Sequence, residues 1–197
     1  MPWLEPVTLR GAHARLEPLS HDHAAGLIEA AKDGDLWKIW YTAIPKAETM
    51  GKEIDRRLGL QAAGTMLPFT VFDADGRIAG MTTYMNVDAP NRRVEIGSTW
   101  YAKRVQRSAL NTQCKLLLLT HAFETLDCIA VEFRTHFFNH QSRRAIERLG
   151  AKQDGILRSH QIAPNGTLRD TVVYSIIASE WPTVKAHLNY QLNEKPR

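Results

Sequence analysis

The chain has 197 residues, of which 44% are hydrophobic and 23% charged, with a net charge of +4 and a pI near 9.2. These values are ordinary for a globular protein and exclude a disordered chain, so we expect one domain over residues 1–197. Two cysteines, Cys114 and Cys128, exclude a disulfide framework and a cysteine-based metal site. No apolar run reaches membrane-spanning length and no signal peptide is recognisable, which predicts a cytoplasmic protein.

The first third of the chain predicts one strand and two helices. Val7–Leu19 alternates loosely between apolar and polar residues, as a strand does. Ser20 is suited to cap a helix over His21–Lys32. Asp35–Tyr41 predicts a short helical turn, and Ala47–Ala63 a second helix with one apolar stripe.

Three aromatic residues, Trp37, Trp40 and Tyr41, gather in the short turn between these helices. The simpler interpretation is that they pack over the sheet. The functional interpretation is that they line a pocket for an acceptor substrate, because Trp and Tyr offer both an apolar wall and a polar group.

The middle of the chain predicts an antiparallel meander. Turn residues separate three runs rich in strand formers, which are Pro68–Asp73, Arg77–Val87 and Arg93–Tyr101. Gly97 favours a bulge in the third strand. Lys103–Ser108 then forms a basic loop before the next element.

The second half begins with the strongest helix signal, Leu110–Leu126, which is apolar on most sides and should be largely buried. The remaining predicted elements are a strand Cys128–His136, a helix Gln141–Leu149 capped by Asn139, strands Ile156–Ile162 and Thr171–Ile177, and a terminal helix Glu180–Leu192. This order predicts an α+β fold: an antiparallel meander, then β-α-β-α, then a C-terminal hairpin.

The residues indicate an anion site more clearly than a nucleophile or a metal site. No Gly-x-Ser-x-Gly turn is present, and the eight histidines form no metal-like pair on a helix. Gln106, Arg107 and Ser108 lead into the long helix, whose free N–H groups through Thr112 favour phosphate, and Arg104 adds charge. A solvated basic loop explains the same residues equally well.

Three motifs follow one another from residue 95 to residue 151. They are Glu95-Ile-Gly-x-x-Trp100, Gln106-x-x-Ala109-x-Asn111, and Asn139-x-x-Ser142-Arg-Arg-x-Ile-x-Arg-Leu-Gly-Ala151. In this order, and around an apolar helix, they resemble the GCN5-related N-acetyltransferases (GNAT), in particular the RimJ/RimL-type branch that acetylates ribosomal protein N-termini. The resemblance covers most of the chain and implies a mixed central sheet flanked by helices.

Two positions depart from the pattern of that family. Its pyrophosphate loop reads Gln/Arg-x-x-Gly-x-Gly/Ala, where this chain has Ala109 and Asn111. Both are tolerable because the main-chain N–H groups are the key donors. Trp100 also lies one residue further from Glu95 than the family pattern has it, which fits a bulge. Such a bulge would splay this strand from the next parallel one and open a slot for a pantetheine arm.

The resemblance implies acetyl-CoA or CoA as the cofactor. The cofactor-binding residues would then be Thr99, Trp100, Tyr101, Gln106, Arg107, Ser108, Ala109, Leu110, Asn111, Thr112, Asn139, Ser142 and Arg143. The N–H groups of Trp100 and Tyr101 would polarise the thioester carbonyl. Ser142 would donate a proton or hydrogen bond to the departing thiolate and Asn139 would anchor the cofactor arm, while helix capping is an alternative role for both.

Glu95 is the candidate base, acting through a water. An α-amine of pKa ~7.7 has an appreciable neutral fraction near pH 7, whereas a lysine of pKa ~10.4 has under ~0.1%, so an α-amine needs only a modest base. The alternative, held equal, is a structural carboxylate that pairs with Arg92 or Arg93.

We therefore predict an acetyl-CoA-dependent N-acetyltransferase that acetylates a primary amine, either a protein N-terminal α-amine or a small-molecule amine. Cys114 lies within a buried helix, so transfer should be direct, without a covalent enzyme intermediate. The alternatives are a non-catalytic CoA-binding module and a basic RNA- or ribosome-binding protein, although the sequence lacks an aromatic-basic stripe. No metal is expected. The acceptor's identity and a homodimer formed through the terminal hairpin stay open.

Overall fold

The computed structural model describes residues 3–42 and 44–194. The strands are β1 (Leu9–Arg10), β2 (Ala14–Pro18), β3 (Met66–Asp73), β4 (Ile78–Asp88), β5 (Arg93–Tyr101), β6 (Ala130–His136), β7 (Lys152–Ile162) and β8 (Leu168–Ile177). The α-helices are α1 (Ala24–Lys32), α2 (Met50–Ala62), α3 (Leu110–Thr120), α4 (His140–Glu147) and α5 (Trp181–Asn193).

The strands form one eight-stranded sheet in the order β1-β2-β3-β4-β5-β6-β8-β7. Every neighbouring pair is antiparallel except β5 and β6, which are parallel. Parallel neighbours need a crossover, and α3 supplies it. The predicted α+β fold, with its meander, its β-α-β-α segment and its final hairpin, is confirmed.

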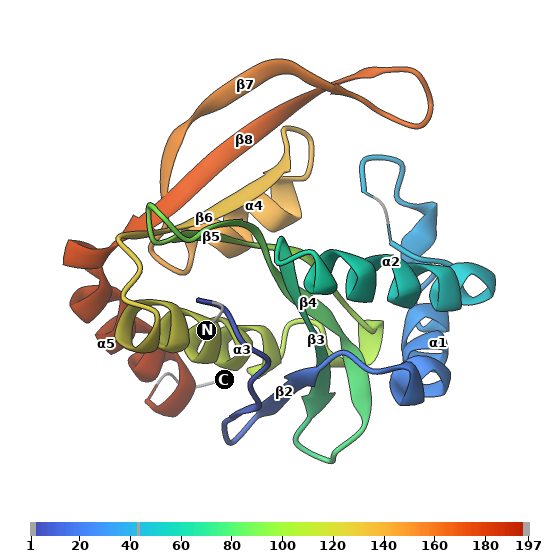
Figure 1. Ribbon diagram of the computed structural model, residues 1–197, viewed down its shortest axis with the longest axis horizontal. Coiled ribbons are helices and arrows are strands. Elements are labelled where there is room, and N and C mark those ends of the chain that lie inside the picture. The colour runs from blue at the N-terminus through green and yellow to red at the C-terminus, as the bar shows by residue number, and fades with distance from the viewer. Residues whose placement is uncertain (1–2, 43, 195–197) are drawn as a thin grey trace.

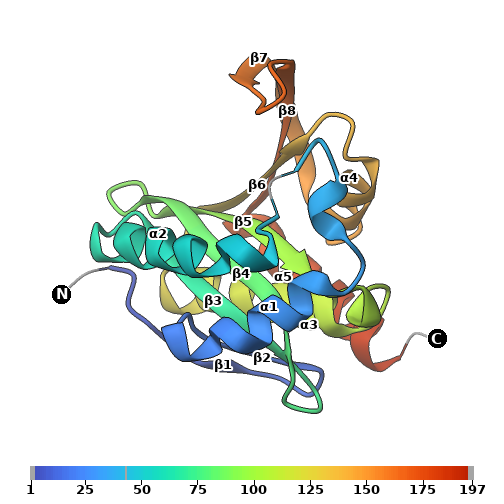
Figure 2. The ribbon, with the colours of Figure 1, turned by 90° about the vertical axis from the view of Figure 1, so that its right-hand side faces the viewer.

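Helices cover both faces of the sheet (Figures 1 and 2). The larger core lies where α3 and α5 pack on the sheet, and it includes Tyr84, Leu118 and Phe133. A second core lies under α1 and α2 and includes Met81 and Trp100. Each helix turns an apolar stripe inward, so burial of these stripes fixes both layers.

The first predicted strand and the long predicted helix both differ from the structure. The single strand expected over Val7–Leu19 is wrong: β1 and β2 form a small hairpin, closed by a hydrogen bond from Gly11 N–H to the Ala14 carbonyl. The helix expected over Leu110–Leu126 occupies the expected place, but its last turn, His121–Thr125, is a π-helix. Apolar periodicity locates a segment but does not record such changes in winding.

The C-terminal hairpin of β7 and β8 extends from the body as an arm (Figure 1). β7 begins at Lys152 rather than at the predicted Ile156, because its first residues already pair with β8. Over residues 3–42 and 44–194, we find no helix with the length and apolar character needed to span a bilayer.

Candidate active site

The two parallel strands at the centre of the sheet run together only briefly. β5 and β6 are paired at three positions, the last of which joins Glu95 to Glu132. Beyond that pair, residues 96–101 of β5 and 133–136 of β6 have no pairing with each other, while β6 remains paired with β8. We call this separation the β5–β6 divergence. It leaves two unpaired backbone edges in the middle of the sheet, as the sequence predicted.

A bulge in β5 accompanies the divergence. The register with β4 shifts between Thr83, which pairs with Gly97, and Met81, which pairs with Trp100, so β5 carries an extra residue. Ser98 takes a left-handed conformation with φ of 47°. Because a bulge bends its strand and increases its twist, this one turns the end of β5 away from β6.

A buried arginine holds the bulge from the helical layer. Arg57 of α2 is 2% exposed and donates to Thr83 Oγ1 at 2.6 Å and to the Ser98 carbonyl at 3.4 Å. Its third contact is with Glu53, at 2.7 Å. Sequence reasoning missed Arg57, which occupies a helical position expected to be apolar or exposed.

The backbone of Tyr101 faces the divergence. Ala102 N–H donates to the carbonyl of Ala79, at the start of β4, at 2.8 Å. Since alternate residues of an antiparallel strand face the same partner, Trp100 also turns its backbone groups toward β4, and Tyr101 turns its own the other way. Gln106 Nε2 donates to the Tyr101 carbonyl at 3.0 Å. Of the two predicted oxyanion donors, only the Tyr101 N–H is thus suitably directed.

The N-terminus of α3 lies just past this point. Ala109 has φ of −68° and ψ of −17°, so the position where the family pattern has glycine needs none here. The positive φ of the loop, 60°, falls instead on Arg107. Leu110 N–H is bound by Ser108 Oγ at 3.2 Å.

Two first-turn amides of α3 remain for a ligand. Within the described chain, the N–H groups of Asn111 and Thr112 form none of the observed hydrogen bonds, as expected for the first turn of a helix. The Thr112 hydroxyl is occupied, because Arg148 Nη2 donates to it at 3.1 Å. These N–H groups and the helix dipole suit a pyrophosphate.

The cations predicted around this site are only partly available. Arg104 turns away from α3 and binds the Asp73 carboxylate and, at 2.9 Å, the Ile78 carbonyl. Arg143 turns inward, where its Nε donates to Tyr174 Oη at 3.1 Å. Arg107 is exposed, and among the predicted residues it is the cation left to meet phosphate.

The N-terminus of α4 lies beyond the end of β6. Asn139 Oδ1 accepts the Ser142 N–H at 3.0 Å, which confirms that Asn139 caps the helix. The amide nitrogen of Asn139 and the hydroxyl of Ser142 form no hydrogen bond to any other part of the described chain. The capping role therefore leaves both groups free for a ligand.

Glu95 is a buried carboxylate at the start of the divergence. It is 5% exposed, and its Oε2 accepts from Asn86 Nδ2 at 2.7 Å and lies 3.6 Å from Arg134 Nε. Burial raises the pKa of Glu95, which the bond from Asn86 and the charge of Arg134 only partly oppose. The expected alternative partners were wrong: Arg92 pairs with Asp127, and Arg93 with Glu132.

The register places a row of polar side chains on one face of the sheet. Glu95 and Glu132 are paired, and Arg134 and His136 follow in phase on β6, so all four point to the face that carries α1 and α2. We call this the acceptor face. Sequence reasoning did not single out His136 as a ligand-binding residue, although its phase with Glu132 along the predicted strand could have done so.

The predicted aromatic residues close one end of the acceptor face. The Trp40 ring meets the His136 ring at 5.3 Å between centroids, and the Tyr41 ring lies 5.9 Å from it. Phe138 adds a third ring 5.8 Å from His136. Trp40 remains 53% exposed, whereas Trp37 is half-buried and joins none of the ring pairs observed in the described chain.

Two titratable groups of α3 lie behind β5. Cys114 is fully buried, and burial raises the pKa of its thiol to about 12, which makes it a poor nucleophile. Lys115 donates to Thr99 Oγ1 at 3.1 Å, and burial lowers its pKa to about 8. The described residues contain no cluster of three or more metal-ligating side chains.

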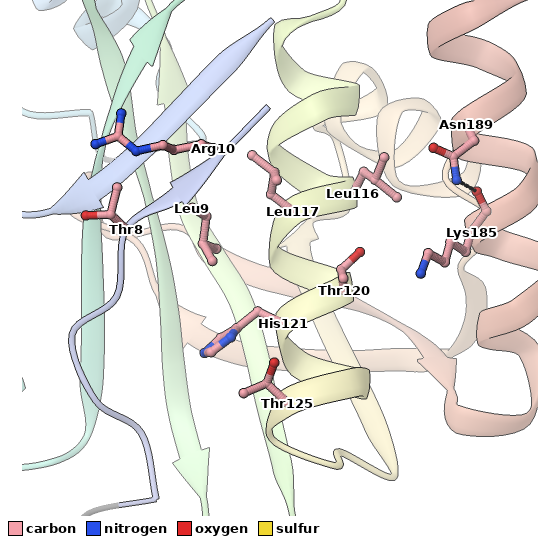
Figure 3. A pocket seen from close by; sticks show the side chains of 10 residues that line it. All are labelled: Thr8, Leu9, Arg10, Leu116, Leu117, Thr120, His121, Thr125, Lys185 and Asn189. Atoms are coloured by element: carbon pink, nitrogen blue, oxygen red, sulfur yellow. Dashed lines mark hydrogen bonds between the residues drawn. The ribbon is translucent and has the colours of Figure 1, made fainter. Parts of the chain in front are cut away.

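A separate hollow lies elsewhere in the structure. It measures about 340 Å³ and runs between the β1 region, the C-terminal half of α3 and α5, where Leu9, His121 and Lys185 are among its lining residues (Figure 3). None of the predicted site residues lines it. The helix N-terminus that suits phosphate is at the other end of α3, so this hollow is not the candidate site.

Comparison with known proteins gives a family match. The family model described as "Acetyltransferase (GNAT) domain" matches residues 13–152. A curated relative is YdaF of Bacillus subtilis (strain 168), provisionally named a ribosomal N-acetyltransferase, which is 36% identical over 107 residues. That match spans 54% of this chain and 57% of YdaF, so the chain covers less than two thirds of this relative.

Two solved structures have the same architecture over nearly the whole chain. A GCN5-related N-acetyltransferase from Brucella melitensis has a TM-score of 0.88 and 30% identity, with 98% of this chain and 88% of that chain covered. RimJ of Mycobacterium smegmatis in complex with CoA-disulfide has a TM-score of 0.78 over 94% of this chain and 93% of that chain. Its identity is 21%, so it supports the fold alone.

Proposed function

Because the chain belongs to the acetyltransferase (GNAT) domain family, we propose that it transfers the acetyl group of acetyl-CoA to a primary amine, namely a protein N-terminal α-amine or a small-molecule amine. The observation that carries this proposal is the β5–β6 divergence, which lies between the N-termini of α3 and α4. A long cofactor with a phosphate end and an amide-bearing arm fits donors arranged in this way.

The residues present fit such a cofactor. Free N–H groups at Asn111 and Thr112, beside the exposed Arg107, offer donors and charge to the pyrophosphate. The free amide of Asn139 offers a donor to a carbonyl of the pantetheine arm. Bound acetyl-CoA would supply the activated acetyl thioester.

Three groups of the chain would assist the transfer. The Tyr101 N–H, which faces the divergence, would bind the thioester oxygen as negative charge develops on it. Glu95, whose pKa is raised by burial, would take the proton of the attacking amine through a water. The Ser142 hydroxyl would donate to the departing thiolate.

An α-amine is the acceptor that this machinery suits best. A single buried carboxylate is a modest base, and an α-amine with a pKa of ~7.7 needs little more near neutral pH. The Bacillus subtilis relative is named as a ribosomal N-acetyltransferase, which is compatible with such an acceptor. Burial and a raised pKa make Cys114 unsuited to carry the acetyl group as a covalent intermediate. The amine would therefore attack the thioester directly.

Two measurements test this function. Calorimetry with acetyl-CoA and CoA should give micromolar binding, and thiol release should then be measured over a panel of N-terminal peptides and simple amines. Release that depends on peptide supports the proposal. Binding without release over the whole panel would leave a CoA-binding module, and the absence of any CoA binding would contradict the transferase itself.

A further inference from the structure

A buried imidazole donor on the acceptor face lacks an acceptor. His136 is 4% exposed, and its Nδ1 accepts the Phe138 N–H at 3.1 Å. The neutral ring must then carry its proton on Nε2, because Nδ1 uses its lone pair for that bond. Nε2 is buried and has no partner among the described residues. An unmade hydrogen bond of this kind is costly, so the ring is suited to a ligand oxygen.

The His136 ring is held neutral by its surroundings. Its pKa is lowered by burial first and then by the Arg169 cation, against a smaller opposing effect of Asp170. A neutral ring whose only lone pair is already used is a donor and not a base. This residue therefore differs in role from Glu95.

A second donor without a partner lies on the same face. Arg169 of β8 is two residues from Thr171, which pairs with His136, so Arg169 shares the face of His136. Its Nε is buried without a hydrogen bond, and within the described chain Arg169 forms none of the observed ion pairs. The Arg169 charge lowers the pKa of both Glu95 and His136, in keeping with its place on the same face.

We propose that His136 Nε2 and the Arg169 guanidinium form the specificity-determining site for the acceptor, and that they bind an oxygen next to its amine. The inference rests on the proposed function and deepens it. The acceptor class is then an α-amine whose own or next carbonyl or carboxylate oxygen meets these donors. Trp40 and Tyr41 would wall the site, since both rings contact His136.

The spacing along β6 suits such an acceptor. Glu132, the partner of Glu95, is four residues before His136, or about 13 Å along the strand. A water-mediated contact from Glu95 to the amine, one extended residue and a final hydrogen bond together span about 12 Å. A simple alkylamine has no oxygen that could reach His136 and Arg169.

Acceptor selectivity provides the test. We would compare kcat/KM, expressed per concentration of neutral amine, for alaninamide, alanine, an alanine-initiated dipeptide amide and isopropylamine. Isopropylamine keeps the amine-bearing carbon and the methyl group of alaninamide but replaces the carboxamide with a methyl group and so has no oxygen. Counting only the neutral amine removes the effect of the different amine pKa values. The wild type should prefer the three oxygen-bearing acceptors over isopropylamine. Alanine above the two amides would identify a free carboxylate as the bound oxygen, and the opposite order would identify a peptide carbonyl.

Isosteric variants separate the ligand contact from the fold. His136→Asn keeps an oxygen where Nδ1 accepts the Phe138 N–H but removes the Nε2 donor, whereas His136→Gln keeps a donor near Nε2. His136→Asn should lower the alaninamide to isopropylamine ratio about fivefold through KM, and His136→Gln should restore part of it. Arg169→Met should lower kcat/KM for alanine at least tenfold. His187→Asn on the exposed face of α5 is the control and should leave the ratio unchanged.

Failure of this inference is distinguishable from failure of the proposed function. Equal use of alaninamide and isopropylamine by the wild type, or an unchanged ratio in folded His136→Asn and Arg169→Met, would overturn the inference while acetyl transfer stands. If no amine were acetylated, the same ligands would be titrated against the imidazole NMR signals of His136. A shift of Nε2 with alaninamide and not with isopropylamine would uphold the site, and no shift with either would overturn it.

Discussion

Glu95 is paired with Glu132 at the last step where β5 and β6 run side by side. Two carboxylates on one face repel each other, and Arg134, which contacts both, relieves the repulsion. Burial nevertheless keeps the pKa of Glu95 raised. The pair therefore marks the point where the sheet opens and also leaves a carboxylate there that binds a proton readily.

Replacement of Glu95 by Gln should lower kcat about 100-fold if Glu95 is the base. It should also stabilise the protein at pH 7. The folded-state pKa lies above the unfolded value of 4.5, so the stabilising effect of the protonated carboxyl is complete below pH 4.5 and is lost as pH rises through the folded-state pKa. Urea unfolding of both proteins at pH 4 and pH 7 checks this. A structural ion pair would give the opposite sign at pH 7.

Asn139 offers a matched pair of substitutions. Asn139→Ala removes the cap of α4 and should cost about 1 kcal/mol of unfolding free energy as well as CoA affinity. Asn139→Asp keeps the oxygen that accepts the Ser142 N–H but removes the amide donor. We expect near wild-type stability with at least about fivefold weaker CoA binding by calorimetry. Unchanged CoA affinity in Asn139→Asp would leave Asn139 with the capping role alone.

Ala109→Gly restores the small residue of the family's loop and should bring no gain. Ala109 already has helical φ and ψ, so glycine adds no backbone room that the structure needs. Because Ala109 stands at the N-cap of α3, where glycine is tolerated at least as well as alanine, stability should change by less than about 0.5 kcal/mol. The Kd for CoA should change less than about twofold. A large gain in CoA affinity would show that alanine obstructs the pyrophosphate.

Lys115→Met should stabilise the protein at pH 7 by up to about 3 kcal/mol, since burial lowers the lysine pKa from 10.5 to about 8. Between these values the unfolded chain binds more protons than the folded one, so wild-type stability should rise with pH over that interval. Denaturant unfolding at pH 7 and pH 10 should show the variant's advantage shrinking. An advantage that is constant with pH would contradict the effect of buried charge.

Periodicity and spacing in the sequence were enough to predict the α+β fold class and the positions of most helices and strands. Arg93–Tyr101 has the same bounds in the structure as in the prediction, because its β-formers lie between clear turn residues. The bulge was predicted from Gly97, a local feature, and from the extra residue before Trp100 relative to the pattern of the family that the chain resembles. The turn at Gly11 was missed because a loose alternation continues across it.

Long-range contacts account for what the sequence did not predict. Arg57 reaches the bulge from another layer of the fold, and Arg169 comes near His136 only because β8 lies beside β6. The inward turn of Arg143 depends in the same way on Tyr174. Local patterns do not record which distant strand will lie beside a given residue.

Amide hydrogen exchange with and without CoA tests the central claim most directly, namely that the cofactor lies at the β5–β6 divergence. We expect CoA to slow exchange at the N–H groups of Tyr101, Asn111 and Thr112, which face the divergence or begin α3. The amide of Val131, within the paired part of β6, should change little. Protection confined to the hollow near Leu9 and Lys185, or no protection at all, would contradict the account.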